Sequence, residues 1–195
     1  MVLVAAIVLI VLALHGTGGA GGASPTPTLL PGQSANASGR PIDGIPCGAE
    51  HLAYHIHQHI DLYDHGNHID LPAYVGFVIQ GSGSQETVKC LYAIHVHYEQ
   101  TANFIHVESP TKKLYSLGQV VDIWKATSRT TLPPNSSFLA RLLTAKPNEI
   151  TVFTNKKRWT QGWRTVPLSN HETITLEIGK PVVPPKLWTS WSEVG

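Results

Sequence analysis

The sequence predicts an α+β fold, mostly antiparallel β-sheet with one or two short helices. Apolar and polar residues alternate over residues 52–63, 88–98 and 103–108, which is the period of a half-buried β-strand. Apolar residues recur at convincing helical spacing only over residues 117–126. Hydrophobic residues make up 42% of the 195-residue chain, which is enough for one ordinary domain with a core.

The N-terminal segment, residues 1–23, is predicted to be a signal or membrane anchor. Residues 1–14 are all apolar, and no charged residue occurs before Arg40. The neutral stretch through Gly22 extends this run toward the roughly 20 residues of a spanning helix. Small residues before Ala23 equally fit the cleavage site of a signal peptide. In both cases we expect the rest of the chain outside the cytoplasm, either membrane-anchored or secreted.

Three further regions follow in the predicted domain organisation. Residues 24–46 form a flexible linker, because Gly, Ala, Ser, Thr, Pro and Asn dominate and cannot bury a core. Residues 47–180 form a histidine-rich β domain. Residues 181–195 form a Pro/Trp-rich tail, in which Trp188 and Trp191 either pack on the sheet or make an assembly contact.

The two cysteines, Cys47 and Cys90, are predicted to form a disulfide. An even cysteine count in an exported chain favours a bridge. The bridge would close a loop of about 44 residues and hold the first two histidine-bearing strands side by side. We therefore expect residues 54–60 to pair with residues 92–98. The alternative, two thiolate ligands, fits less well, since structural zinc sites usually bring cysteines in close pairs.

The elements of the domain can be placed in chain order. Strands are expected at residues 52–63, 68–71, 74–80, 88–98, 103–108, 149–154 and 173–178. The first strand ends in a turn at Asp64–Asn67. Helices are expected at residues 117–126, with Ser116 as the N-cap, and at residues 137–144.

Histidine occupies alternate positions in three of these strands. Alternate side chains of a strand point to the same face, so the imidazoles share one face and Ile and Val the other. Neutral imidazole is the commonest protein ligand for transition metals, and the pattern therefore predicts a metal site. The candidate ligands are His55, His57, His59, His95, His97 and His106. Carboxylates on the same faces are alternative ligands or partners that orient the rings: Asp61, Glu99 and Glu108.

The ligand types narrow the metal and the function. Imidazoles with carboxylate support suit Cu(II) or Zn(II), whose identity stays open. The first functional hypothesis is a membrane-tethered protein that sequesters or delivers the metal. The alternative is a metalloenzyme in which three histidines hold a metal that activates water or oxygen. A net charge of +1 predicts no nucleic-acid partner, and protein partners are unknown.

Residues 47–124 resemble a family of uncharacterised, membrane-anchored extracytoplasmic proteins of bacteria and archaea. The matching motifs are His55-Ile-His-Gln-His-Ile60, Leu71-Pro-Ala73, Cys90, His95-Val-His97, Ile105-His-Val-Glu-Ser-Pro110 and Leu117-Gly-Gln-Val-Val-Asp-Ile-Trp124. Two positions depart from the pattern, since Val96 replaces Thr and Tyr98-Glu99 stands where Asp is expected. The resemblance implies a metal-binding extracytoplasmic domain and supplies no reaction.

Overall fold

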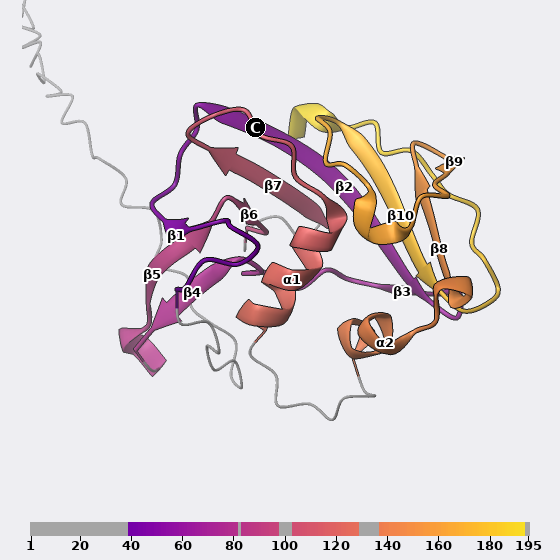
Figure 1. Ribbon diagram of the computed structural model, residues 1–195, viewed down its shortest axis with the longest axis horizontal. Coiled ribbons are helices and arrows are strands. Elements are labelled where there is room, and N and C mark those ends of the chain that lie inside the picture. Colours follow the sequence, from indigo (N-terminus) through magenta and orange to yellow (C-terminus); the bar gives the residue numbers. More distant parts are fainter. Residues whose placement is uncertain (1–38, 82, 98–102, 129–136, 194–195) are drawn as a thin grey trace, which may run out of the picture.

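Ten β-strands and two α-helices form the computed structural model, which describes residues 39–81, 83–97, 103–128 and 137–193 (Figure 1). The strands are β1 (Cys47–Gly48), β2 (Tyr54–Asp64), β3 (Asn67–Ile69), β4 (Phe77–Gln80), β5 (Thr87–Tyr92), β6 (Ile94–His95), β7 (Phe104–Ser109), β8 (Ile150–Thr154), β9 (Lys157–Arg158) and β10 (Glu172–Ile178). The helices are α1 (Leu117–Thr127) and α2 (Phe138–Thr144), and 3-10 turns lie at Gly83–Gln85, Pro147–Glu149, Trp163–Thr165 and Trp191–Glu193. The predicted α+β class is confirmed.

The strands form two sheets. The larger sheet has the order β6-β7-β2-β10-β8-β9, and β3 pairs with the far half of β2. The smaller sheet has the order β1-β5-β4. Neighbouring strands are antiparallel except for β2 and β10, which run parallel over seven residue pairs. The strand β2 is the longest and joins the two halves of the larger sheet.

The predicted pairing of residues 54–60 with 92–98 is wrong, because β7 lies between β2 and β6. β7 pairs with β2 over six residues, from Tyr54 opposite Ser109 to His59 opposite Phe104. β6 pairs with β7 over only two residues, since the next amide, that of Val96, bonds to the carbonyl of Val75 instead. The chain therefore leaves the sheet just after His95.

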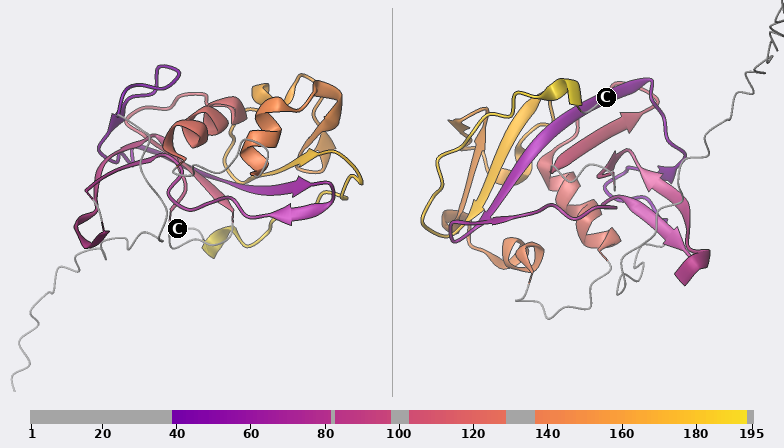
Figure 2. Two further views of the ribbon diagram at one scale, coloured as in Figure 1. Left: turned by 90° about the horizontal axis from the view of Figure 1, so that it is seen from below. Right: turned by 180° about the vertical axis from the view of Figure 1, so that it is seen from behind.

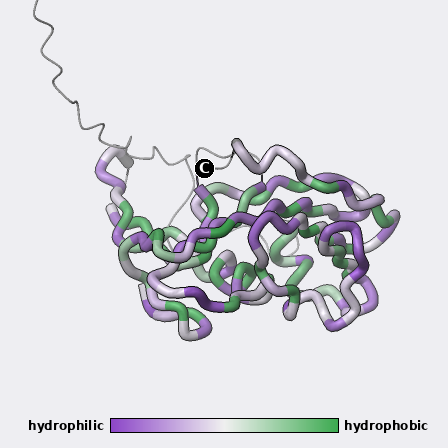
Figure 3. The backbone as a smooth tube through the Cα atoms, turned by 90° about the horizontal axis from the view of Figure 1, so that it is seen from above, coloured by the Kyte–Doolittle hydropathy of each residue, from purple (hydrophilic) through white to green (hydrophobic). Residues whose placement is uncertain are grey.

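One face of the larger sheet carries the hydrophobic core. Ile56, Ile60 and Leu62 of β2 are buried on this face, as the alternation predicts. Leu52 is 59% exposed because the strand begins only at Tyr54, so its predicted place on the apolar face is wrong. Hydrophobic and hydrophilic residues alternate along the tube in Figure 3.

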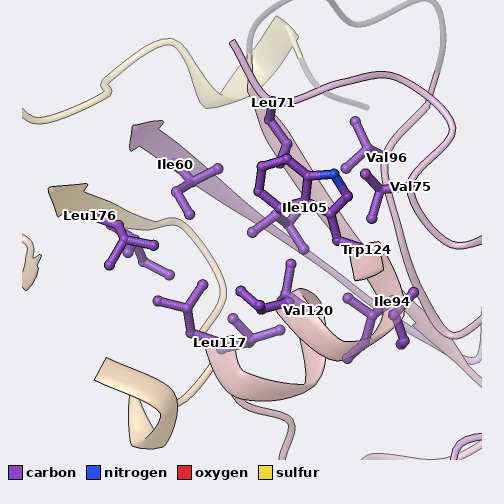
Figure 4. Close-up of a cluster of buried hydrophobic side chains, with 14 of the residues drawn as sticks. Ile60, Leu71, Val75, Ile94, Val96, Ile105, Leu117, Val120, Trp124 and Leu176 are labelled. Atoms are coloured by element: carbon purple, nitrogen blue, oxygen red, sulfur yellow. The ribbon is translucent and has the colours of Figure 1, made fainter. Parts of the chain in front are cut away.

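Both helices cover the apolar face, as Figure 2 shows. Ser116 precedes α1 in an extended conformation, and its backbone N–H donates to the side chain of Gln119, which satisfies one free amide at the helix start. Ser137 accepts a hydrogen bond from the Ala140 amide at the start of α2. In Figure 4 the side chains of α1, including Trp124, meet Ile105 and other strand residues.

The disulfide between Cys47 and Cys90 is present and links β1 to β5, with Cα atoms 5.5 Å apart. It holds two strands of the smaller sheet together. The expectation that it would place the two histidine-bearing strands side by side is wrong, because β1 and β5 belong to a different sheet from β2. The disulfide constrains β5, and β5 leads directly into β6, which carries His95.

The C-terminal tail crosses the face of the sheet opposite the helices (Figure 2). The backbone N–H of Trp188 donates to the hydroxyl of Thr173 in β10, and the amide of Val183 donates to the carboxylate of Glu177. Both tryptophans pack on sheet side chains: Trp188 against His59 and Phe104, and Trp191 against Phe104. Of the two alternatives for these tryptophans, the structure shows packing on the sheet.

The predicted anchor and most of the predicted linker lie outside the described residues. Within the described part of the chain, no helix is long and apolar enough to cross a membrane. Ile45, near the end of the predicted linker, is 1% exposed and belongs to the hydrophobic core.

Candidate metal centre

Three neighbouring strands, β6, β7 and β2, present the histidines on the face opposite the core. The register places His57 of β2 opposite His106 of β7, and His95 of β6 opposite His106 from the other side. One step along, His55 lies opposite Glu108. Cross-strand neighbours have Cβ atoms about 4.5–5.5 Å apart, so side chains from three strands meet.

The Glu108 carboxylate lies at the centre of this group. Its Oε1 is 3.1 Å from His55 Nε2, 3.6 Å from His106 Nδ1 and 3.7 Å from His97 Nε2. Its Oε2 is 3.5 Å from His95 Nε2. The side chain is only 3% exposed, so a buried carboxylate is surrounded by four imidazoles.

Glu108 is ionised at neutral pH. Burial raises its pKa, but the surrounding imidazoles, His106 and His97 ahead of His95 and His55, lower the pKa further than burial raises it. The net pKa lies below the ordinary range of a glutamate. An anionic carboxylate surrounded by imidazole nitrogens that can coordinate a metal is suited to bind a cation.

His95 shows which of its nitrogens faces the centre. Its Nδ1 is 2.9 Å from the carbonyl oxygen of Tyr92, which can only accept, so Nδ1 carries the proton. Burial lowers the pKa of His95 to about 3, with the effect of Glu108 opposing it, and the ring is neutral at neutral pH. Its Nε2 therefore offers a lone pair toward Glu108 and toward His97 Nε2 at 3.0 Å. A backbone carbonyl on Nδ1 is the partner that commonly orients a metal-binding histidine.

The close approach of the chain to His95 depends on a glycine. Gly76 has φ +87°, and a Cβ there would come within 2.7 Å of His95 Cβ. The Phe77 ring that follows packs edge-on against His95, with centroids 5.3 Å apart. The loop before β4 thus closes one side of the centre.

His57 and His106 complete the buried part of the centre. His57 is 5% exposed, and burial, reinforced by the neighbouring His106 and His55, lowers its pKa to about 4. Burial also lowers the pKa of His106. The ring of His57 lies 4.4 Å from that of His55 and 4.5 Å from that of His106. Neutral rings keep a lone pair free for a metal.

Two sets of ligand atoms in the described residues each lie within 4.8 Å of one another. The first set is His55, His57 and His106, and the second is Glu50, His95, His97 and Glu108. Glu50, which comes from the loop before β2, was not among the predicted ligands. Partial loss of water and the nearby Glu108 raise the pKa of Glu50. A loop residue does not belong to the alternating pattern of a strand, so no pattern in the sequence pointed to Glu50.

The remaining candidates lie outside these sets. His59 is on the same face, but the Trp188 ring stacks on it at 4.6 Å and Phe104 meets it edge-on. Asp61 lies 3.9 Å from His59 Nδ1 and 3.8 Å from His68 Nε2, away from Glu108. Glu99 lies outside the described residues.

Solvent reaches the centre at two histidines. The side chains of His55 and His97 are 32% and 34% exposed, whereas those of His95 and His106 are 0% and 4% exposed. The buried rings form the floor of the centre and the exposed rings form its rim. The side of the centre that carries His55 and His97 is therefore the one in contact with solvent.

Comparisons of this chain with protein-family models, with curated proteins and with solved structures gave no match. Any function assigned to the centre therefore rests on its residues.

Proposed function

We propose that this protein binds Zn(II) or Cu(II) at the centre around Glu108 and serves to sequester or deliver the metal. The observation that carries the proposal is the ionised Glu108 carboxylate within 3.7 Å of four imidazole nitrogens. Imidazole and carboxylate ligands suit these two borderline ions. The two cysteines are oxidised to a disulfide, so no thiolate competes for the metal.

The proposed location is outside the cytoplasm, tethered by residues 1–23 or secreted after their cleavage. A disulfide persists in oxidising compartments, which supports export. The resemblance to membrane-anchored extracytoplasmic proteins supports the same location. A site with two rim histidines exchanges metal with solvent more readily than a closed site, as sequestration and delivery require.

The alternative, a metalloenzyme, draws support from the same two rim histidines. Catalytic zinc sites keep a coordination position open for water, and here the solvent side of the centre offers one. A metal with an exchangeable water and slow release favours the enzyme, whereas fast transfer to a chelator favours delivery.

The test uses full-length protein purified without a histidine tag. Metal analysis of the purified protein, followed by competition titrations with Zn(II) and Cu(II), gives content and affinity. We expect His95→Ala to weaken binding more than about 100-fold, since loss of an outer partner alone costs about 10–100-fold. The matched control is His65→Asn, an exposed histidine ten residues from His55 at the other end of β2, roughly 33 Å away.

Wild-type protein without micromolar or tighter affinity for either ion would contradict the proposal. Equal losses from His95→Ala and His65→Asn would contradict it as well, because they would place the binding outside the Glu108 centre.

A further inference from the structure

The centre holds more ligands than one ion uses. Zinc sites in proteins are almost always four-coordinate, and the two sets around Glu108 together offer five histidines and two glutamates. Ligand atoms lie within 4.8 Å of one another inside each set. The two sets adjoin, because the ring of His106 in the first set lies 4.4 Å from that of His97 in the second, and Glu108 approaches histidines of both sets.

Glu108 directs its oxygens unequally toward the two sets. Oε1 lies 3.1 Å from His55 and 3.6 Å from His106 of the first set, and 3.7 Å from His97 of the second set. Oε2 approaches His95 of the second set at 3.5 Å and has no hydrogen-bond partner within the described residues. A carboxylate in this orientation can give one oxygen to each of two ions.

A buried nitrogen in the first set points to a ligand of its own. His57 Nε2 is enclosed and has no hydrogen-bond partner within the described part of the chain, although its ring lies between those of His55 and His106. Buried polar atoms normally have partners. An ion held only by Glu50, His95 and His97 would leave the buried His57 Nε2 without a ligand.

We infer that the centre is dinuclear: one divalent transition-metal ion lies among His55, His57 and His106, a second lies among Glu50, His95 and His97, and Glu108 bridges them. The inference rests on the proposed metal-binding function and adds the stoichiometry and the bridging residue. The negative charge of Glu108 between the two ions reduces their repulsion, and Glu50 at the surface adds a second negative group. Ions of two-metal sites lie about 3.5–4 Å apart, a spacing that one carboxylate spans.

The rim offers a matched pair of variants. His55 and His97 belong to different sets, and their side chains are exposed to nearly the same extent, 32% and 34%. Replacing either by alanine removes a ligand from one set and leaves the buried floor intact. Circular dichroism of each variant checks that the fold is retained.

The experiment measures stoichiometry and ion–ion coupling in the full chain, stripped with a chelator and reloaded. Native mass spectrometry with Zn(II) should show two ions per wild-type chain, one in His55→Ala, one in His97→Ala and two in the His65→Asn control. Electron paramagnetic resonance of wild-type protein with two Cu(II) ions should show a signal broadened or diminished by spin coupling. Each rim variant with one Cu(II) should show an ordinary mononuclear signal.

Other outcomes separate the inference from the proposed function. A single wild-type ion, lost in both rim variants, would overturn the dinuclear centre and leave metal binding intact. Two uncoupled Cu(II) ions would also overturn it, because the second ion would then lie elsewhere. A wild-type chain that binds no ion would refute both proposals. The wild-type coupling measurement does not depend on the folding of any variant.

Discussion

At the scale of single residues, the environment decides which histidines can serve as ligands. His95 is fully buried with its Nδ1 proton on a backbone carbonyl, and its lone pair faces Glu108. His59 has the same strand parity, yet Trp188 covers it. His171 is exposed and its ring stacks on Trp191 at 4.8 Å. The three imidazoles differ in what surrounds them more than in their place in the sequence pattern.

We predict that His97→Ala weakens metal affinity far more than His171→Ala does. The Nε2 atom of His97 lies 3.0 Å from that of His95 and 3.7 Å from Glu108, whereas the exposed ring of His171 stacks on Trp191. Isothermal titration with Zn(II) should show at least about a tenfold loss for His97→Ala and less than about a twofold loss for His171→Ala. Similar losses would argue against the centre.

We also predict that the metal-free protein loses stability as pH falls from about 6.5 to 4. His57 and His95 have folded-state pKa values of about 4 and about 3, against 6.5 for the free side chain. The unfolded chain therefore binds more protons in this window, and protons favour unfolding. Each pKa unit corresponds to about 1.4 kcal/mol. Below pH 4.5 the glutamate of the unfolded chain binds a proton that Glu108 in the folded state, whose pKa is lowered, does not, so stability falls in the same direction.

Urea unfolding of chelator-treated protein at pH 7.5 and pH 5.0 measures this effect. The midpoint should be lower at pH 5.0, and a variant with His57 replaced by Gln should show a smaller difference. An equal or higher midpoint at pH 5.0 would contradict the burial of neutral imidazoles.

At the scale of elements, the larger sheet separates two kinds of chemistry by strand parity. In β7, Ile105 and Val107 face the core, and His106 and Glu108 face the candidate metal centre. Packing of α1 against the apolar face therefore holds the candidate ligands on the other face in register. Parity was readable from the sequence, because it depends only on neighbouring residues of one strand.

Ile105→Ala should destabilise the fold by about 2–5 kcal/mol, since it leaves a cavity beneath α1. Ile105 is 0% exposed, whereas Leu114, the matched control, is 80% exposed. Leu114→Ala should change stability by less than about 0.5 kcal/mol. Chemical denaturation of both variants tests the difference, and comparable losses would show that Ile105 is not a core residue.

At the scale of the whole molecule, the smaller sheet and the disulfide support the centre from one side. β5 carries Cys90 and continues into β6, so the position of His95 depends on how β5 is held. The tail supports the other end, where Trp188 packs on the sheet. Between these two supports, the exposed side chains of His55 and His97 form the rim of the centre.

Loss of the disulfide should cost about 4 kcal/mol, the chain-entropy value for a loop of about 44 residues. The variant to compare carries Cys47→Ala together with Cys90→Ala, and its unfolding by urea is measured against wild-type protein without reductant. Hydrogen exchange should rise in β4 and β5 before it rises in β2 or β10. Unchanged stability would mean that noncovalent contacts alone hold the smaller sheet.

Local patterns were sufficient for the fold class, most element positions, the core face and the histidine face. The first helix begins at Leu117 as predicted, and the face of β2 that carries His57 is the one that parity assigns. Each of these features depends on residues close together in the chain.

The strand order, by contrast, was decided by tertiary structure. Alternation with a period of two residues shows which side chains share a face of a strand, but it does not show which strands pair with each other. The place of β7 between β2 and β6 could therefore not be inferred. That place puts Glu108 among four imidazoles, brings Glu50 in from a loop, and leaves His59 under Trp188. Contacts between distant segments depend on how the whole chain packs, and for that reason the composition of the centre emerged only from the folded molecule.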